Sequence, residues 1–364
     1  MTSATARRFR RLSPDRVKEL ILLGIIVGSV VVFGSFVDGY LSGRFFNRVT
    51  TSVVIVAILA AAQALVIFSR NIDLSVGSTV GVSAYLTADF LTANTWANPV
   101  VAMIIAMAVG AVLGSLNGLL VAYGRVPAII VTLGTLAIFR TLISLYSGGA
   151  NVLAGDLPDW VLGFNNLTVL SIAGFDLRLV FVIAVAVVVI LQWALRRLRV
   201  GRRLYAIGSN PEAARQAGLA APRLIMVSFV GAGALAGLAG FMFMVRAGTI
   251  SATAGSGLEL ESVAAAVVGG VSIFGGSGTM FGAFLGAILI DTLELSLVRV
   301  PEVSEFWRDA ALGILILLAV ILDATLQRRF TRRLTREVRG PDATDQQSSD
   351  RSLSSVVGGG PVDE

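Results

Sequence analysis

Polar side chains that could contact a solute lie inside or beside long apolar stretches of this sequence. Burying such groups is costly unless they are paired or hydrated, so they are candidates for lining a path for a polar solute. The alternative is structural, because a carboxylate at a helix end often caps the helix and a buried threonine usually bonds its own backbone. The candidates are Asn71, Asp73, Ser75, Asn117, Thr132, Thr135, Glu259 and Glu261.

Histidine and cysteine, which often perform catalysis, are absent, and the only lysine does not follow a glycine-rich turn. The chain has 0 His and 0 Cys, which excludes imidazole bases, thiol nucleophiles and disulfides. Its only lysine, Lys18, precedes the first apolar run, whereas a phosphate-binding P-loop carries a lysine directly after its glycine-rich turn. We therefore expect a chain without enzyme activity, metal site, cofactor or ATP site of its own.

The elements that must hold these residues are membrane-spanning helices. Of the 364 residues, 55% are hydrophobic and 14% are charged, and the mean hydropathy is +0.82. Because one helical crossing takes roughly 20 apolar residues, this composition suits about ten crossings. We predict an all-α, polytopic protein of the lipid bilayer. The formal net charge of +6 does not indicate nucleic-acid binding, since basic residues of membrane proteins collect on the cytoplasmic side.

Ten apolar runs are the predicted spans. The first follows a basic cytoplasmic segment, residues 1–19, and is too long for the hydrophobic part of a cleavable signal peptide, so we expect it to remain as a span. The transmembrane domain covers residues 20–327, and residues 328–364 form a basic and then disordered cytoplasmic tail. The spans are approximately Leu20–Val37, Val53–Phe68, Leu74–Leu91, Val100–Tyr123, Ile129–Leu145, Leu179–Leu195, Leu224–Val245, Leu260–Phe274, Met280–Val298 and Ala310–Leu326.

The distribution of positive charge predicts the orientation of these spans. All but seven of the 29 Lys and Arg residues fall in segments that ten spans place on one side of the membrane. Basic residues favour the cytoplasm, so both termini are expected there. The apolar stretch Asn166–Phe175 is too short to cross and is expected on the outer face or as a re-entrant segment. The seven remaining basic residues, expected at outer helix ends, are Arg44, Arg48, Arg140, Arg178, Arg246, Arg299 and Arg308.

Two short patterns recur five spans apart. Gly110-Ala-Val-Leu-Gly114 resembles Gly282-Ala-Phe-Leu-Gly286, and Ile72-Asp-Leu resembles Leu258-Glu-Leu. An odd offset means that corresponding helices run in opposite directions, which is typical of an inverted repeat with the substrate path at the repeat interface. The sequence thus allows a 5+5 inverted repeat, while chance recurrence of small residues in apolar helices is the alternative.

The polar loop of about residues 196–223 predicts a short, well-capped helix. Asn210 suits an N-cap, Pro211 the first turn and Glu212 the positive end of the helix dipole, while Gly218 suits the C-terminus. The five arginines between Arg196 and Arg203 place this helix in the cytoplasm. Such a helix could dock on another protein and pass its motion to the spans, or it could be a solvated loop helix without a partner.

Two further features lie in or beside the predicted eighth and ninth spans. Asp291 and Glu294 stand one helical turn apart and could relay protons, although a salt bridge or a water-filled groove is the more ordinary reading. The glycines from Gly269 to Gly282 have the wrong spacing for a dinucleotide-binding loop. We expect them to form tight turns and close helix contacts, with Gly275-Gly-Ser-Gly278 as a short inner turn.

Several blocks together resemble a known family. The pattern Glu212-Ala-Ala-x-x-x-Gly218 is similar to the loop by which ABC importer permeases contact their ATPases. The blocks at 71–78, 117–140, 201–219 and 257–297, in this order, resemble the ribose-type sugar ABC transporter permeases of the branched-chain amino acid and sugar permease superfamily. Ser69-Arg-Asn71 and the stretch 139–149 are more similar to the rhamnose and autoinducer-2 permeases.

This resemblance implies a membrane-spanning permease subunit of an importer for a monosaccharide or a related polyol or furanose. It implies a second permease subunit, identical or paralogous, and separate ATPase subunits that bind ATP and magnesium. An extracytoplasmic sugar-binding protein would deliver the ligand, and the location would be the bacterial cytoplasmic membrane. Coupling to the ATPase is expected at Asn210, Pro211, Glu212, Ala213, Ala214 and Gly218.

A second hypothesis is a secondary transporter driven by protons or sodium without an ATPase. The possible inverted repeat and Asp291 favour it, because membrane carboxylates often carry protons in such transporters. The capped cytoplasmic helix and the lack of histidine count against it.

Overall fold

The computed structural model describes residues 14–37, 40–172 and 174–299, together with Trp307, Ala310, Gly313, Ile314, Leu317 and Ile321. Two compact units, Met1–Leu317 and Leu318–Glu364, are distinguished by their internal contacts, and all described residues except Ile321 belong to the first. The predicted tenth span, most of the basic N-terminal segment and the C-terminal tail lie largely outside the described residues.

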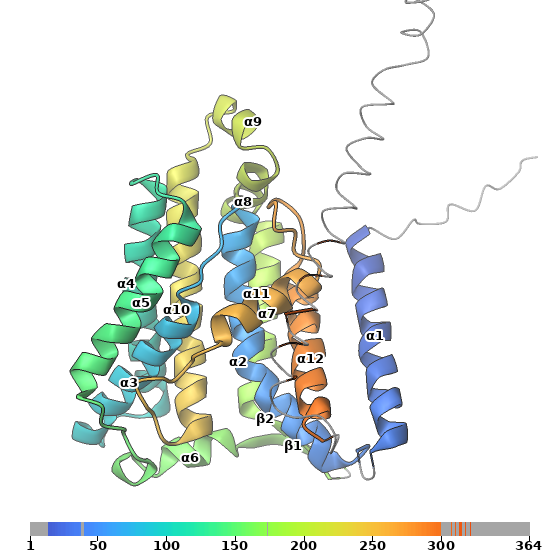
Figure 1. Ribbon diagram of the computed structural model, residues 1–364, viewed down its shortest axis with the longest axis vertical. Coiled ribbons are helices and arrows are strands. Elements are labelled where there is room, and N and C mark those ends of the chain that lie inside the picture. The colour runs from blue at the N-terminus through green and yellow to red at the C-terminus, as the bar shows by residue number, and fades with distance from the viewer. Residues whose placement is uncertain are drawn as a thin grey trace, which may run out of the picture. The chain divides into compact units, whose positions relative to one another are not determined.

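The first unit is a bundle of helices with one small sheet (Figure 1). The helix α9 lies at one end of the bundle, and α6 and the strands lie at the other. In chain order the elements are α1 (Pro14–Phe36), α2 (Gly43–Phe68), α3 (Val76–Ala93), α4 (Pro99–Ala122), α5 (Ala128–Ser147), η1 (Ala154–Asp156), α6 (Trp160–Asn165), β1 (Thr168–Ile172), β2 (Phe175–Arg178), α7 (Leu179–Arg197), α8 (Arg199–Ser209), α9 (Pro211–Gln216), α10 (Ala221–Ala247), α11 (Leu258–Val268) and α12 (Met280–Leu297).

Among the described residues, seven helices are long and apolar enough to cross a membrane, namely α1, α2, α4, α5, α7, α10 and α12. The predicted third span corresponds to α3, whose serine, threonine and glycine residues make it less apolar than these seven. The ten-span count, the cytoplasmic termini and the inverted repeat therefore stay predictions.

The structure differs from the predicted architecture in two details. The stretch expected as one continuous eighth span, Leu260–Phe274, contains the 11-residue helix α11, which at 1.5 Å per residue reaches about 16 Å and is too short to cross a core of about 30 Å as a helix by itself. Gly269 and Gly270, the latter with φ +87°, end this helix. The fold is also not purely helical, because β1 and β2 pair antiparallel within the stretch expected on the outer face. Gly174, with φ +82°, lies between the two strands.

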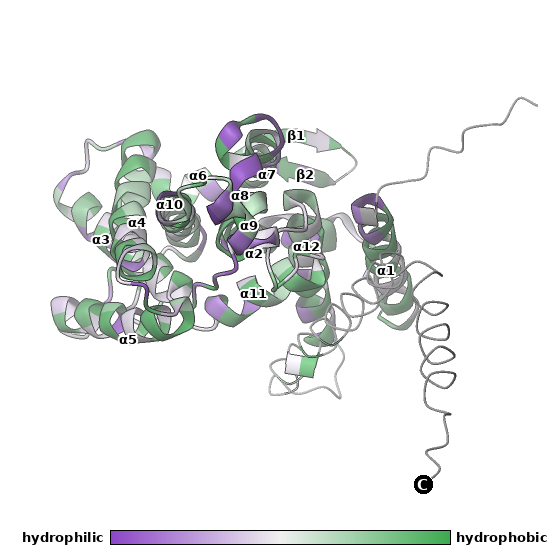
Figure 2. Cartoon of the chain, turned by 90° about the horizontal axis from the view of Figure 1, so that it is seen from above, coloured by the Kyte–Doolittle hydropathy of each residue, from purple (hydrophilic) through white to green (hydrophobic). Residues whose placement is uncertain are grey.

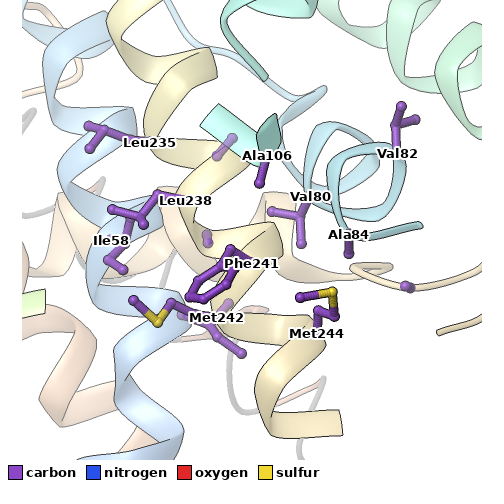
Figure 3. Packing of buried hydrophobic residues seen from close by; sticks show 14 of the residues in the cluster. Ile58, Val80, Val82, Ala84, Ala106, Leu235, Leu238, Phe241, Met242 and Met244 are labelled. Atoms are coloured by element: carbon purple, nitrogen blue, oxygen red, sulfur yellow. The ribbon is translucent and has the colours of Figure 1, made fainter. Parts of the chain in front are cut away.

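The helix α2 forms the centre of the bundle. Of its most apolar window 94% is buried inside the protein, compared with 11% for α1 at the periphery. Ala57, Ala60, Ala61 and Ala64 of α2 are fully buried, and such small side chains let neighbouring helices approach on several faces. Figure 3 shows one side of this core, where Ile58 of α2 lies near Leu238 and Phe241 of α10.

The helices α4 and α10 are in backbone contact through glycines. A Cβ on Gly110 would lie 2.1 Å from the carbonyl oxygen of Gly233, and a Cβ on Gly233 would lie 2.3 Å from the carbonyl oxygen of Gly110. Glycine is required at both positions because neither backbone can withdraw without separating the helices. Asn98 fixes the start of α4 by accepting hydrogen bonds from the amides of Val100 and Val101.

Candidate functional site

The N-termini of α3 and α11 meet inside the bundle. The chain is non-helical at residues 69–75, between α2 and α3, and again at 248–257, between α10 and α11. A Cβ on Gly77 of α3 would lie 2.0 Å from Oε2 of Glu259 and 2.6 Å from the carbonyl oxygen of Gly255. Broken helices of this kind commonly form the solute sites of transporters, because their free backbone groups can bind a ligand.

The loop before α3 holds three of the predicted site residues in one hydrogen-bonded cluster. The carboxylate Oδ1 of Asp73 accepts hydrogen bonds from the Ser75 amide at 2.8 Å and from the Ser75 hydroxyl at 2.6 Å. Asn117 of α4 donates from Nδ2 to the same hydroxyl at 2.7 Å. All three side chains are buried, and Oδ1 of Asn117 has no hydrogen-bond partner among the residues that the structure describes. This cluster therefore contains one buried acceptor that no described residue satisfies.

The remaining candidates near this loop mostly satisfy their own backbone. Thr135 donates to the carbonyl oxygen of Thr132 one turn earlier at 3.3 Å, and Asn71 donates to the carbonyl and hydroxyl oxygens of Ser69. Thr132 lies closer to the cluster, with its hydroxyl 3.4 Å from the carbonyl oxygen of Ile72. Thr135 and Asn71 thus make the short-range hydrogen bonds expected of residues with a structural role, while Thr132 joins α5 to the loop before α3.

The two glutamates predicted before the eighth span differ in their surroundings. Glu259 lies in the first turn of α11 against Gly77, and within the described ranges its buried Oε2 has no hydrogen-bond partner. Glu261, two residues along α11, is also buried. Arg140 of α5, half-buried, lies near Glu259 and donates from Nη1 to the carbonyl oxygen of Ala254 at 2.6 Å. This arginine fixes α5 to the non-helical segment before α11.

The short helix α9 has the capping that the sequence predicts. Oδ1 of Asn210 accepts a hydrogen bond from the Ala213 amide at 3.0 Å, and Pro211 occupies the first turn. Gly218 has φ +74°, and the Leu219 amide donates back to the carbonyl oxygen of Ala214 at 3.0 Å, which closes the C-terminus. Within α9 only Ala214 is buried, so the helix rests on one small side chain and exposes the rest. Figure 2 shows hydrophilic residues gathered on α8 and α9.

A tight junction joins the segment before α9 to two other parts of the bundle. The guanidinium of Arg70, at the end of α2, donates from Nε to the carbonyl oxygen of Gly208 at 2.5 Å and from Nη2 to that of Ser209 at 3.2 Å. The Gly276 amide donates to the carbonyl oxygen of Phe68 at 3.1 Å. Arg70 itself has φ +65°, a left-handed conformation that is uncommon outside glycine. These contacts connect the residues just before α9 to the end of α2 and to the glycine turn before α12.

The same turn contacts the middle of α8. The phenol of Tyr205 donates to the carbonyl oxygen of Gly278 at 2.9 Å, and its ring packs on Phe68 with centroids 4.5 Å apart. Burial raises the pKa of Tyr205 above its ordinary value, so the phenol keeps its proton and remains a donor. The turn expected at Gly275–Gly278 is confirmed, with φ of +80°, +69° and +121° at its three glycines.

Three functional candidates were missed by the sequence reasoning. Gln63 of α2 is fully buried and donates to the carbonyl oxygen of Asp73, so it supports the cluster from beneath. The signal available in the sequence is the single amide side chain of Gln63 inside an apolar run. From the sequence, Arg140 is expected at an outer helix end although it lies within an apolar run, and Arg70 is expected as one of the cytoplasmic basic residues and as part of the Ser69-Arg-Asn71 variation.

Comparisons with known proteins decide the family. The chain matches the family described as branched-chain amino acid transport system / permease component over residues 45–320. It belongs to this family. A relative from Enterobacter sp. (strain 638), named autoinducer 2 import system permease protein LsrC, is 37% identical over 315 residues, which cover 85% of this chain and 88% of the relative. Proteins of the same name from Salmonella typhi and Escherichia coli O9:H4 (strain HS) are 35% and 34% identical over 88% of this chain, covering 89% and 91% of their own lengths.

No solved structure matches the chain. The family match and the named relatives confirm the resemblance to ribose-type and autoinducer-2 permeases drawn from the sequence blocks. Together with the seven apolar helices, they identify a multi-pass membrane permease of the ABC importer type.

Proposed function

We propose that this permease moves a small hydroxyl-rich ligand, a monosaccharide or a related furanose or polyol, and that a separate ATPase drives it through α9. The observation that carries the coupling is the exposed, doubly capped α9 together with the junction between Arg70, Gly208 and Gly276. In this proposal a partner that pulls on α9 moves the end of α2 and the glycine turn before α12. The Gly276 amide is bound to the Phe68 carbonyl oxygen, and the Arg70 guanidinium is bound to the carbonyl oxygens of Gly208 and Ser209.

The solute path in this proposal passes the meeting point of α3 and α11. Oδ1 of Asn117 and Oε2 of Glu259, which no group in the described part of the chain satisfies, are acceptors that suit ligand hydroxyls. Asp73 and Ser75 orient Asn117 in this arrangement, and Arg140 holds the segment that carries Glu259. The autoinducer-2 import permeases among the relatives make autoinducer 2 one ligand to test, alongside ribose and rhamnose.

The partners in this proposal are two ATPase subunits that bind ATP and magnesium, a second permease subunit and an extracytoplasmic binding protein. The site of action is the bacterial cytoplasmic membrane, with α9 facing the cytoplasm. The family match and the relatives named as import-system permeases support these kinds of partner protein, but identify no individual partner.

Charge reversal on α9 tests the coupling. Glu212→Arg should abolish co-purification of the ATPase encoded with this chain, and Gly218→Trp should do the same by distorting the C-terminus of α9. The control is Asp159→Arg, which reverses an exposed carboxylate just before α6, at the other end of the bundle. Co-purification that survives Glu212→Arg, or that is lost equally in the control, contradicts the assignment of α9.

A secondary transporter remains the competing function because Asp291 is buried at 4% exposure in α12. Its carboxylate accepts a hydrogen bond from the Ser52 hydroxyl at 2.5 Å, and Arg246 donates to the Ser52 carbonyl oxygen at 3.3 Å. These contacts favour a structural role in tying α12 to α2. Uptake that continues with an inactive ATPase and collapses with a proton uncoupler at constant ATP would establish the secondary mechanism instead.

A further inference from the structure

Four arginines gather in one cleft at the end of the bundle opposite α9. The cleft has a volume of about 380 Å³ and is lined by Arg44 and Arg48 of α2, Arg178 at the end of β2 and Arg246 of α10, together with uncharged polar side chains of α2 and α6. These are four of the seven basic residues that the sequence leaves away from the cytoplasm. Basic residues are disfavoured at that end of a membrane protein, so their collection from three separate parts of the chain calls for a reason.

Within the described part of the chain, carboxylates lie behind the lining of this cleft rather than in it, with Asp291 on Ser52 and Asp176 on Asn47. No acidic side chain is among the residues that line the described cleft. Arg178 donates to neutral acceptors, Oδ1 of Asn166 at 3.1 Å and the carbonyl oxygen of Asn165 at 3.4 Å. Arg246 is attracted by the buried Asp291 behind Ser52. Four guanidiniums around so small a volume repel one another, and an anion between them would relieve this repulsion.

The cleft borders a hairpin that exposes several apolar side chains. Val169, Leu170 and Ile172 of β1 are 56%, 52% and 60% exposed, beside the exposed Thr168 and Ser171. An antiparallel sheet in water normally turns its apolar side chains toward a core. Such a strand is suited to the acyl region of a bilayer. Figure 2 shows the two strands at the rim of the bundle beside α7.

Hydrogen bonds connect this hairpin to the helix that carries two of the arginines. Asn47 of α2 accepts from the Asp176 amide at 2.8 Å and donates to Oδ2 of Asp176 at 3.3 Å. Arg44 and Arg48 flank Asn47 in the first two turns of α2. The arginines therefore lie where a helix enters the membrane, which is the depth of lipid headgroups, next to a surface that suits lipid tails.

We propose that the cleft binds the phosphate of an acidic phospholipid. The fork of a guanidinium forms paired hydrogen bonds with phosphate oxygens, and four of them from α2, β2 and α10 would surround one headgroup. The acyl chains would lie along β1. The lipid would thereby join the first turns of α2 to the end of α10, a function separate from ATPase coupling and independent of it.

The test is a lipid-binding measurement on the full chain purified in a neutral detergent. Native mass spectrometry and thermal unfolding are followed during titration with phosphatidylglycerol, phosphatidylcholine or inorganic phosphate. We expect bound phosphatidylglycerol and a raised unfolding temperature, and little effect of phosphatidylcholine at the same concentration. Equal effects of the two lipids overturn the proposal, and so does full protection by inorganic phosphate alone, because the ligand would then be the free anion.

Two double variants locate the site. Arg44→Gln with Arg48→Gln should weaken phosphatidylglycerol binding by on the order of tenfold. The matched control is Arg199→Gln with Arg203→Gln, which removes two exposed arginines at the same spacing from α8 at the other end. Equal loss in both variants indicates non-specific charge attraction and contradicts the proposal. Unchanged lipid binding with lost docking of an extracytoplasmic protein in the α2 variant would make the cleft a protein-docking surface and also overturn it.

Discussion

Replacing Gly208 by alanine should separate α9 from the rest of the bundle. An added Cβ would lie 1.8 Å from the carbonyl oxygen of Phe68 and 2.6 Å from the amide nitrogen of Gly276. Because real Cβ contacts are essentially never shorter than 3.0 Å, the end of α8 must move about 1.2 Å from α2. This movement lengthens the hydrogen bonds from the Gly276 amide to Phe68 and from Arg70 to Gly208.

The energetic effect follows from two contributions. Overpacking of a close contact costs about 1–3 kcal/mol, and each of the two hydrogen bonds contributes about 0.5–1.5 kcal/mol. We therefore expect Gly208→Ala to lower the free energy of unfolding by about 2–6 kcal/mol. The control is Gly134→Ala in α5, where nothing lies within 4 Å of the new Cβ. Alanine favours a helix over glycine, so this variant should be as stable as the parent or about 0.5–1 kcal/mol more stable.

Two assays follow the consequence for function. Thermal unfolding in detergent compares the two variants with the parent, and vesicles containing the permease with its ATPase and binding protein give the number of ligand molecules taken up per ATP hydrolysed. For Gly208→Ala we expect a lower unfolding temperature and ATP hydrolysis that continues with little uptake. An unchanged unfolding temperature and an unchanged uptake ratio would refute the reasoning that this junction transmits movement.

Three other residues can be substituted to test the N-cap of α9, the buried cluster of Asp73, Ser75 and Asn117, and the meeting point of α3 and α11. Asn210→Ala should lower the free energy of unfolding by about 1 kcal/mol and speed amide hydrogen exchange in residues 211–216. Asn210→Asp should keep these amides protected, because aspartate also caps a helix. Equal exchange in the two variants contradicts the capping role. Asp73→Ala should destabilise the protein by about 1–3 kcal/mol in thermal unfolding because the Ser75 amide and hydroxyl lose their acceptor, and Asp73→Asn should cost less; the reverse order speaks against the cluster. Gly77→Ala should abolish uptake, since its Cβ would lie 2.6 Å from the carbonyl oxygen of Gly255, which cannot turn aside as the nearby Glu259 carboxylate can. Uptake at the parent's rate would show that α3 and α11 do not need this close approach.

The local features that the sequence predicted well depend on a few neighbouring residues. The cap of α9 follows from Asn210 and Pro211, and its end from Gly218, because these residues act on backbone groups within four positions. The apolar runs similarly indicate the long helices, since length and hydropathy alone suffice to recognise them.

Features that depend on distant contacts could not be predicted. The shortness of α11 depends on how Gly269 and Gly282 pack, as a Cβ on Gly269 would lie 2.2 Å from the carbonyl oxygen of Gly282. Arg140 and Glu259 are 119 positions apart, and nothing in either neighbourhood indicates that α5 and α11 bring them together. Conversely, Thr135 is a polar residue inside an apolar run, as a site residue would be, but its hydroxyl donates to a carbonyl oxygen of its own helix. Only the packing reveals this hydrogen bond.

The central claim is that an external ATPase supplies the movement of this permease through α9. The most direct measurement is accumulation of labelled autoinducer 2, ribose and rhamnose in vesicles that contain the chain alone, the chain with its ATPase and binding protein, or the same complex with Glu212→Arg. We predict concentrative uptake of at least one of these ligands in the complete complex with ATP, and none with the chain alone or with the variant. Concentrative uptake by the chain alone would contradict the account.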